Sequence, residues 1–552
     1  MTSNASDRPT DYDAIVVGTG FAGIYATHKL RDQLGLNVLT VDTAGDIGGT
    51  WYWNRYPGSR CDIESIHYSY SFSDEVQQEW TWTEKFASQP EILEYLNYVV
   101  DKFDLRRNML FDTTIESMEW IDGRWTVRTD TGTVFTADYV ICGTGNLSVP
   151  KAVDIEGIDS FAGEVYLTGR WPHSGVDFAG KRVGVIGTGS TGIQVIQEVS
   201  KIADHLTVFQ RTANYATPIG NGPSDEQRVK AVKEEYARIR EASRNSFVGI
   251  PYDKAQPSAL AVSEAERRRT FDECWDAGGF SIASDSFQDV MFDKAANDTV
   301  SEYIRDRIRA RVEDPELAEL LAPDGHAYGT KRPPLEIDYY ETFNRDNVDL
   351  VDVRTHPIES VTPTGVRTDL GNVDLDVLVL ATGFDAMTGP LLKLGIRGKE
   401  GKSLNDAWSN GPRTYLGVMV HDFPNLFLIT GPQSPSVLYN MPLAIEDHVD
   451  FAADAIAHMR DARASVMEAE LTAQDEWVDH SNAVAETTLM PTADSWYVGS
   501  NVPGKPRAVM LYLGGAAGYR AICDDVVSSG YRGFAFLPPV RNEAENAEAT
   551  AT

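Results

Sequence analysis

Cysteine is scarce in this 552-residue chain, and the few cysteines lie far apart. No two of them form a CxxC pair, and no cysteine and histidine stand at the spacing of a metal site. A redox-active CxxC disulfide is therefore excluded, and no metal site is predicted. Free thiols are typical of a reducing compartment, so we expect a cytoplasmic protein. The four cysteines are Cys61, Cys142, Cys274 and Cys523.

Basic residues are also few: 49 lysines and arginines stand against 82 aspartates and glutamates, for a net charge of −33. Nucleic acids and anionic membranes attract net-basic surfaces, so neither is an expected partner. No apolar run reaches 18 residues, and residues 1–13 are polar and acidic where a signal peptide needs a basic and then an apolar stretch. We therefore expect neither a membrane span nor secretion. The acidity fits ordinary solubility and adaptation to high salt equally well.

What the chain does contain is an internal repeat. Residues 14–17 and 183–186 are short β-branched runs, each followed by a GxGxxG turn and an amphipathic helical pattern. The glycines allow a tight turn and let a pyrophosphate approach the helix N-terminus. One such match is weak evidence, but two in this context predict an α/β fold with two Rossmann-like dinucleotide-binding domains. The turns are Gly18, Thr19, Gly20, Phe21, Ala22 and Gly23, and Gly187, Thr188, Gly189, Ser190, Thr191 and Gly192.

The residue at the end of the next strand distinguishes the two copies. Asp42 lies 19 residues after Gly23, and Arg211 lies 19 residues after Gly192. A carboxylate accepts hydrogen bonds from ribose hydroxyls and repels a 2′-phosphate, whereas a guanidinium pairs with that phosphate. The first copy is thus predicted to bind an adenosine ribose with free hydroxyls, and the second to prefer NADPH to NADH. The alternative is that Asp42 and Arg211 only cap their strands.

A charged helical pattern fills residues 221–330, which we interpret as a helical insertion in the second domain. Capping boxes, in which a serine is followed three residues later by Glu or Gln, predict helix starts at Ser224 and Ser263. Strand patterns return at residues 348–353 and 375–384.

At six places the sequence resembles the type I Baeyer–Villiger monooxygenases, class B flavoprotein monooxygenases that include phenylacetone, steroid and cyclohexanone monooxygenases. The matching segments are DIGGTWYWNRYPGSRCDIES (46–65), SQPEILEYL (88–96), KRVGVIGTGSTGIQ (181–194), KRP (331–333), ATGFDA (381–386) and SWYVGSNVPGKPR (495–507). The resemblance implies that FAD occupies the first domain and NADPH the second. It also implies that O₂ and a ketone give an ester or lactone, through a C4a-peroxyflavin and a Criegee intermediate.

The strand and helix patterns, taken with the resemblance, predict a domain arrangement. An FAD-binding domain would take residues 11–150 and 381–540, an NADPH-binding domain 151–220 and 331–380, the helical insertion 221–330, and an acidic tail 541–552. The protein would be a monomer or a weak homodimer, with a small ketone and O₂ as its partners.

The implied reaction needs a permanent positive charge, because an uncompensated peroxide anion in a dry pocket costs several kcal/mol or more. Arg332 is the candidate, since a guanidinium stays charged at any working pH. Its alternative role is an ordinary loop salt bridge. By the resemblance, Asp62 orients Arg332, and Lys331 joins Arg211 and Thr212 around the 2′-phosphate.

The resemblance also assigns further residues to the cofactors. Trp496 resembles a mobile-loop tryptophan that folds over the nicotinamide, and residues 433–441 match a segment that shapes the ketone pocket in relatives. The other expected cofactor-binding residues are Gly49, Thr50, Trp51, Asp62 and Tyr68 near the flavin, Gln194 after the second turn, and Ala381, Thr382 and Gly383 at a strand end.

One family pattern, FxGxxxHxxxWP, fits imperfectly, because Leu167 stands at the histidine position. Leucine cannot form a side-chain hydrogen bond, so either NADPH use is impaired or the leucine simply packs in place of the histidine. Two rival functions also remain. One is a flavin monooxygenase that oxygenates nitrogen or sulfur, which has no need of Arg332 and Asp62. The other is a redox sensor that binds nucleotides without turnover.

The charge reversal between the two copies generates a test. Replacing Arg211→Ala removes a charge-assisted hydrogen bond, so the KM for NADPH should rise by a factor equivalent to about 1.5–3 kcal/mol. The KM for NADH should change far less, because NADH lacks the 2′-phosphate. Steady-state kinetics with both nucleotides measure this, and an equal effect on the two would contradict the assignment.

Overall fold

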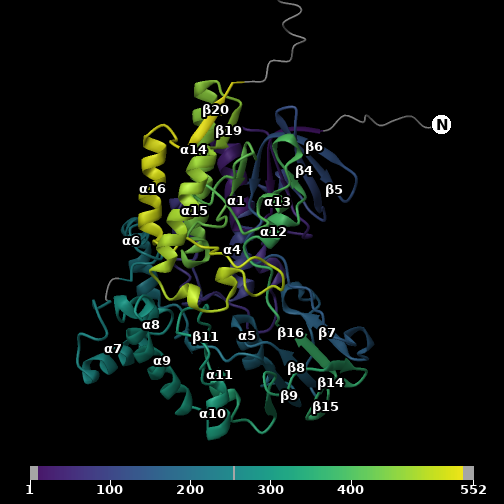
Figure 1. Ribbon diagram of the computed structural model, residues 1–552, viewed down its shortest axis with the longest axis vertical. Helices are drawn as coiled ribbons and strands as arrows, with labels where there is room; N and C mark the ends of the chain where they lie inside the picture. Colours follow the sequence, from purple (N-terminus) through teal and green to yellow (C-terminus); the bar gives the residue numbers. More distant parts are fainter. Residues whose placement is uncertain (1–9, 253–254, 539–552) are drawn as a thin grey trace, which may run out of the picture.

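The computed structural model describes residues 10–252 and 255–538. Its two large sheets lie toward opposite ends of the long axis (Figure 1). Among the described residues, no helix is long and apolar enough to span a membrane.

The first sheet carries the first glycine-rich turn. Its strand order is β17-β4-β5-β6-β1-β2-β3, with β18 paired to β6. The strands are β1 (Thr10–Val17), β2 (Val38–Val41), β3 (Met109–Leu110), β4 (Ile115–Ile121), β5 (Arg124–Thr129), β6 (Val134–Cys142), β17 (Ile396–Arg397) and β18 (Leu426–Leu428). Strands from the N-terminal part of the chain and from beyond residue 395 thus share one sheet.

The second sheet carries the second turn and is parallel throughout its described strands. Its order is β12-β9-β8-β16-β7. The strands are β7 (Glu164–Leu167), β8 (Arg182–Ile186), β9 (His205–Gln210), β12 (Val348–Asp352) and β16 (Val377–Leu380). The two parallel-stranded cores, each opening into a helix through its glycine-rich turn, confirm the predicted α/β fold.

Both faces of β1 are buried, because its side chains alternate between two apolar cores. Ala14 and Val16 belong to the core formed with α1 (Phe21–His28), α4 (Gln89–Lys102) and α14 (Met441–Ala462). Ile15 and Val17 belong to the core on the other face. This explains why the strand reads as a continuous apolar run, as expected for a parallel strand covered on both sides.

The charged segment after the second turn is helical, as predicted. It contains α6 (Glu226–Arg244), α7 (Glu264–Ala277), α8 (Ser281–Ser284), α9 (Lys294–Arg309) and α10 (Pro315–Leu321). Ser263 caps α7 as expected, accepting from the amide of Glu266 at 3.3 Å. The predicted cap at Ser224 is wrong: α6 begins one residue later, because the Asp225 carboxylate accepts from the amide of Arg228 at 2.7 Å.

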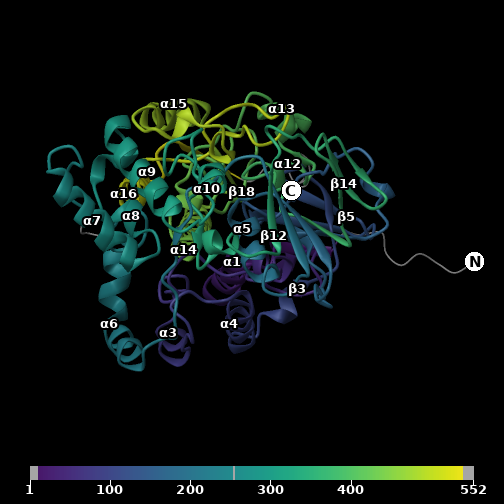
Figure 2. The same cartoon turned by 90° about the horizontal axis from the view of Figure 1, so that it is seen from below.

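Helix α6 attaches this segment to the first sheet's domain. It lies beside α3 (Asp74–Glu79), as Figure 2 shows. The buried Arg240 guanidinium donates to Ser69 Oγ at 2.7 Å and to the carbonyl of His67 at 3.2 Å. The helical segment is therefore held against the residues that lead from Asp62 toward α3.

The remaining elements complete the cover of the sheets. The helices are α2 (Thr50–Trp53), α5 (Ser190–Val199), α11 (Tyr339–Thr342), α12 (Gly389–Leu392), α13 (Leu404–Ala407), α15 (Leu471–Glu486) and α16 (Ala516–Ser528). The small sheets pair β10 (Thr217–Pro218) with β11 (Leu335–Glu336), β14 (Gly365–Thr368) with β13 (Ser360–Thr362) and β15 (Gly371–Asp374), and β19 (Val466–Ala469) with β20 (Phe534–Leu537).

A buried hydrogen-bond chain joins the end of β18 to α14 and α16. The amide of Thr430 donates to His448 Nδ1 at 3.0 Å, which leaves the ring proton on Nε2, 2.8 Å from the Tyr519 hydroxyl. Tyr519 in turn donates to the carbonyl of Leu416. A protonated Nδ1 would lose the hydrogen bond from Thr430 and keep only the carbonyl of Leu428, at 3.4 Å, as a partner. Burial lowers the pKa of His448 to about 4, against a smaller opposing effect of the Leu428 carbonyl.

This chain predicts a loss of stability in acid. In the unfolded chain His448 has a pKa near 6.5, so unfolding takes up a proton that the folded state refuses until about pH 4. The penalty is absent above pH 6.5 and grows to about 3 kcal/mol as the pH falls toward 4. His448→Gln keeps a donor and an acceptor without titrating, so its melting temperature should fall less steeply over this range.

The exposed His458 on the same helix offers a matched control, since His458→Gln should follow the wild-type curve. Melting temperatures measured between pH 7.5 and 4.5 decide the matter. Parallel curves for wild type and His448→Gln would contradict the assignment.

Candidate active site

The first turn has the backbone shape that a bound dinucleotide needs. Gly18 has φ +101°, and a Cβ added there would lie 2.5 Å from the carbonyl oxygen of Gly143. A Cβ on Gly23 would lie 1.7 Å from the carbonyl oxygen of Gly18, so helix and strand could not approach with a larger residue. Helix α1 begins after Gly20 without a side-chain cap among the described residues. Its first amides are thus available to phosphate oxygens.

Asp42 follows β2 directly, as the spacing predicted, but part of its hydrogen-bonding capacity is already used. Its Oδ2 accepts from the amide and hydroxyl of Thr19 at 2.6 and 2.7 Å, and its Oδ1 accepts from the amide of Ala44 at 2.8 Å. A carboxylate offers about four acceptor positions, so capacity remains for a ribose hydroxyl. The sequence had not indicated that Thr19 holds Asp42 in place.

The residues expected near the flavin gather around this turn. A Cβ added to Gly49 would lie 2.9 Å from the Cα of Gly20, and α2 begins at the next residue, Thr50. Trp51 Nε1–H donates to the Tyr68 hydroxyl at 3.2 Å. The Tyr68 ring also packs edge-on against Phe21 at 5.1 Å between centroids. Segments 49–51 and 68 therefore form one wall beside the first turn.

The second turn repeats this geometry. Gly187 has φ +111°, and a Cβ there would lie 2.5 Å from the carbonyl oxygen of Ala381. A Cβ on Gly192 would lie 2.0 Å from the carbonyl oxygen of Gly187. By contrast, a Cβ on Gly189 would meet no described atom within 4 Å, so the turn has an open side there. Helix α5 begins at Ser190, again with no side-chain cap in the described chain.

Two threonines mark the same edge of the second sheet. Thr188 Oγ1 donates to the carbonyl of Thr212 at 2.9 Å, which ties the turn to the residue after Arg211. The Thr382 hydroxyl is buried with no hydrogen-bond partner among the described residues. A buried hydroxyl of this kind calls for a partner. The Thr382 hydroxyl and the uncapped amides at the start of α5 together make this edge of the second sheet suitable for binding a dinucleotide such as NADPH.

Gln194 and Thr191 lie at the junction between the two domains. The Tyr56 hydroxyl donates to Gln194 Oε1 at 2.9 Å and is 3.4 Å from Thr191 Oγ1, and Gln194 Nε2–H donates to the carbonyl of Arg60 at 3.2 Å. Both ends of the Gln194 amide are thus engaged by segment 56–60. Through these hydrogen bonds, Gln194 and Thr191 fix the position of α5 against the first domain.

The two cations expected at the 2′-phosphate lie near each other. Arg211 is exposed directly after β9, and Thr212 follows it. Burial and the positive charge of Arg211 lower the pKa of half-buried Lys331, against the opposing charge of Asp494. Within the described residues neither Arg211 nor Lys331 forms an ion pair. Their free charges favour an anionic ligand.

Arg332 and Asp62 form an ion pair across 270 residues of sequence. Arg332 Nε and Nη2 both donate to Asp62 Oδ2, at 2.9 and 2.7 Å. Arg332 Nη1 donates to the carbonyl of Val437 at 3.2 Å, and the guanidinium carbon lies 5.3 Å from the centroid of the Phe280 ring. The cation is thus held from three sides in a fixed orientation.

The surroundings keep Arg332 charged. Burial opposes its charge, but the carboxylate of Asp62 and then Tyr497 raise the pKa of the guanidinium above its ordinary value. Burial raises the pKa of Tyr497 to about 12, with Arg332 acting in the opposite direction, so this phenol stays neutral. A permanent positive charge therefore stands at this position at every working pH.

Two of the residues around Arg332 were not predicted. Phe280, at the start of α8, carries no local pattern that marks it out. Tyr497 follows the expected Trp496 in a short 3₁₀ helix, Trp496–Val498. Tyr497 is buried, whereas Trp496 is half-buried with its ring 4.4 Å from that of Tyr497. Segment 433–441, expected at the ketone pocket, does reach Arg332 through Val437.

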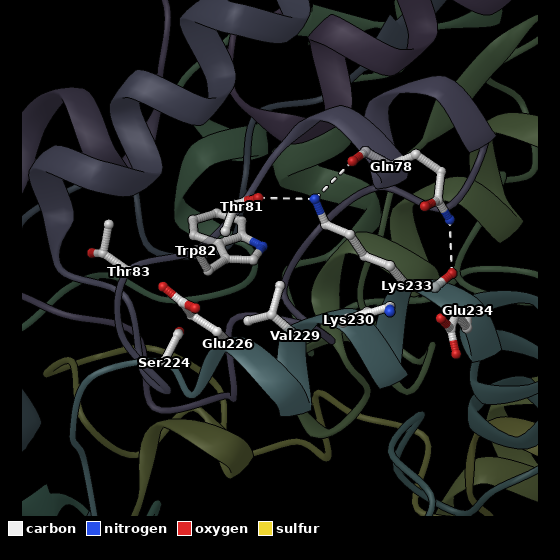
Figure 3. A pocket seen from close by; sticks show the side chains of 10 residues that line it. All are labelled: Gln78, Thr81, Trp82, Thr83, Ser224, Glu226, Val229, Lys230, Lys233 and Glu234. Atoms are coloured by element: carbon white, nitrogen blue, oxygen red, sulfur yellow. Dashed lines mark hydrogen bonds between the residues drawn. The ribbon is translucent and has the colours of Figure 1, made fainter.

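A groove of about 570 Å³ lies elsewhere, between α6 and the segment after α3 (Figure 3). Lys233 Nζ bridges it, donating to the carbonyl of Gln78 at 2.7 Å and to Thr81 Oγ1 at 2.8 Å. Its lining includes neither glycine-rich turn, nor Arg332, nor Asp62. It is therefore separate from the candidate active site.

Comparison with known proteins agrees with this geometry. The family model of the pyridine nucleotide-disulphide oxidoreductases matches residues 15–303. A Baeyer–Villiger monooxygenase from Pseudooceanicola batsensis is 44% identical over 536 residues, covering 96% of this chain and 97% of that one. A phenazine N-monooxygenase from Lysobacter antibioticus is 42% identical over 530 residues, covering 95% and 97%. A solved steroid monooxygenase bound to NADP is 50% identical, with a TM-score of 0.92 and coverage of 96% and 100%.

Two nucleotide-binding sheets with a fixed cation at their junction define a two-cofactor oxidoreductase. The similarity over nearly the whole length narrows this class: the chain belongs to the Baeyer–Villiger monooxygenase family, whose members are FAD-containing, NADPH-dependent enzymes.

Leu167, at the position of the family histidine, is packed in an apolar environment. It ends β7 in register with Leu380 and packs, with Phe161, against the cluster that contains Leu378 and Leu380. The contacts favour the interpretation that leucine replaces the histidine by packing.

Leu167→His should therefore lower stability by about 1 kcal/mol, or the melting temperature by about 2–4 °C. Leu167→Met, which conserves volume, should leave it unchanged. Thermal melting of the FAD-loaded proteins measures the effect. If a larger fraction of NADPH oxidation yielded product in Leu167→His, this would instead favour the interpretation that the absence of the histidine impairs NADPH use.

Proposed function

We propose that this chain catalyses the NADPH- and O₂-dependent oxidation of a ketone to an ester or lactone. When bound, FAD and NADPH supply the electrons and the oxygen activation. The observation that carries the proposal is Arg332, a partly buried cation fixed by Asp62 where the two domains and the helical segment meet. An anion that forms beside this guanidinium is stabilised without any rearrangement of the protein.

Most N–H groups of Arg332 have a defined hydrogen-bond acceptor in the protein. Asp62 takes Nε and Nη2 through a single oxygen, and Val437 takes Nη1, so three of the five N–H donors point to fixed protein atoms. Tyr497 engages a further N–H group, and the donor capacity that remains is available to the reacting anion. Phe280 covers one face of the guanidinium and limits its contact with water, which strengthens its field.

We assign the cofactor residues as expected from the sequence. Gly18, Gly20, Gly23 and Asp42 support the FAD assignment through the shape of the first turn, and Gly187, Gly192 and Thr382 support NADPH at the second. Arg211, Thr212 and Lys331 would hold the 2′-phosphate. Trp496 would lie over the nicotinamide.

The cellular setting follows from the thiols. All four cysteines fall among the described residues and none forms a disulfide; three are buried. We infer that the protein works in a reducing compartment, for which the cytoplasm is the simplest case.

A second candidate function is oxygenation of nitrogen or sulfur, which the similarity to the phenazine N-monooxygenase favours. The two functions make different demands on the protein, because attack on a ketone carbonyl requires an anionic oxidant, whereas a soft nitrogen or sulfur atom does not. Arg332 therefore distinguishes them.

Removing the cation should abolish ketone oxidation selectively. In Arg332→Ala, kcat for ketones should fall by about 10²–10³-fold, as when one electrostatic stabiliser is deleted from an active site. Oxidation of an aryl thioether should fall much less. The measurement is NADPH consumption across a ketone and thioether panel, with mass spectrometry of the products and flavin absorbance to verify FAD loading.

Arg354→Ala provides the matched control, because Arg354 forms its ion pair with Asp352 at the edge of the second sheet. It should behave as wild type. Ketone conversion that survives in Arg332→Ala, or a wild type that oxidises thioethers and amines but no ketone, would favour the second candidate.

A further inference from the structure

A third basic side chain joins Arg211 and Lys331 at the edge of the second sheet. Lys151 is half-buried, and burial followed by the positive charge of Arg211 lowers its pKa. The same charge acts on Lys331. In the part of the chain that the structure describes, none of the three cations forms an ion pair, although acidic residues outnumber basic ones by 82 to 49.

The backbone of Lys151 is fixed to the strand end that supports the second turn. Its amide donates to the carbonyl of Gly383 at 3.0 Å, and a Cβ added to Gly383 would lie 4.0 Å from Lys151 Cε. Gly383 lies two residues after Ala381, whose carbonyl oxygen lies against Gly187. The side chain of Lys151 therefore runs along the edge where the second turn opens.

The ammonium group of Lys151 also contacts the segment that carries Trp496. Lys151 Nζ donates to the carbonyl of Asn501 at 3.3 Å. Asn501 Nδ2–H donates to the carbonyl of Phe384 at 2.8 Å, and Lys505 Nζ contacts Asp385 Oδ1 at 2.7 Å. Segment 495–507 is thus docked on residues 384–385, and Lys151 connects it to the cationic cluster.

The positive charge of Arg211 repels both Lys151 and Lys331, and the half-burial of the two lysines adds a desolvation cost. A multiply charged anion removes both penalties at once. A phosphate monoester carries between one and two negative charges near neutral pH and offers three acceptor oxygens. The chemistry of the cluster therefore matches the 2′-phosphate that separates NADPH from NADH.

We propose that Lys151 is a third cation for this 2′-phosphate, and that through Asn501 it holds segment 495–507 in its docked position when the phosphate is bound. The inference rests on the proposed use of NADPH. It makes Lys151 a specificity residue that also transmits occupancy of the nucleotide site to the segment containing Trp496 and Tyr497.

Nucleotide binding to the oxidised, FAD-loaded enzyme tests the first part without any turnover. In Lys151→Gln, the Kd of NADP⁺ should rise about tenfold, the worth of roughly one charge-assisted contact, while the Kd of NAD⁺ stays unchanged. Lys181→Gln is the matched control: it removes one positive charge from the same domain, where Lys181 pairs with Glu164 at 2.8 Å on the surface. Isothermal titration calorimetry gives all six constants.

Hydrogen exchange tests the second part. Saturating NADP⁺ should protect the amides of residues 495–507 in wild type and Lys181→Gln, and should protect them less in Lys151→Gln. A ratio of NADP⁺ to NAD⁺ affinity that is unchanged in Lys151→Gln would overturn the proposal, whether both Kd values stay the same or both rise by the same factor. If the wild-type enzyme did not bind NADP⁺ more tightly than NAD⁺, the proposed use of NADPH would be wrong, and the proposed role of Lys151 would be wrong with it.

Discussion

The ion pair between Arg332 and Asp62 is the interaction on which the architecture of the site depends. Its two members lie 270 residues apart, and they meet only because both sheets and the helical segment pack against one another. A cation placed in such a junction would be costly without its carboxylate, since removing one partner of a buried pair leaves an uncompensated charge. The pair therefore requires the domains to hold a fixed relative position. It also supplies, at that position, the charge that the proposed chemistry needs.

The domain junction shows several contacts of the same kind. Tyr56 reaches from the first domain to Gln194 on α5, and Arg240 of α6 is buried among carbonyl and hydroxyl groups near His67. Each is a polar group whose burial is compensated by hydrogen bonds. A polar, specific interface of this type fixes geometry more than it adds stability. In a two-cofactor enzyme that property is useful, because electrons must pass between groups bound to different domains.

Much of the nucleotide-binding framework could be predicted because it depends on local backbone geometry. Gly18 and Gly187 need positive φ, and Gly23 and Gly192 allow contacts that any Cβ would block, so the residue type itself reports the structure. The positions of Asp42 and Arg211 followed from a constant strand–turn–helix length. The error at Ser224 is equally local: two adjacent residues could both cap a helix, and the carboxylate of Asp225 was the one that reached the free amide.

The sequence by itself determined the two turns, the helical segment, the reversal of charge between the two copies and, through its resemblance to a family, the importance of Arg332 and Asp62. Only the tertiary structure decided what surrounds them. Phe280, Val437 and Tyr497 reach Arg332 from three separate segments, and Lys151 reaches Gly383 and Asn501 from the link between the sheets. The reason is physical: a turn is specified by the steric demands of consecutive residues, whereas a contact between distant segments depends on how whole sheets and helices pack.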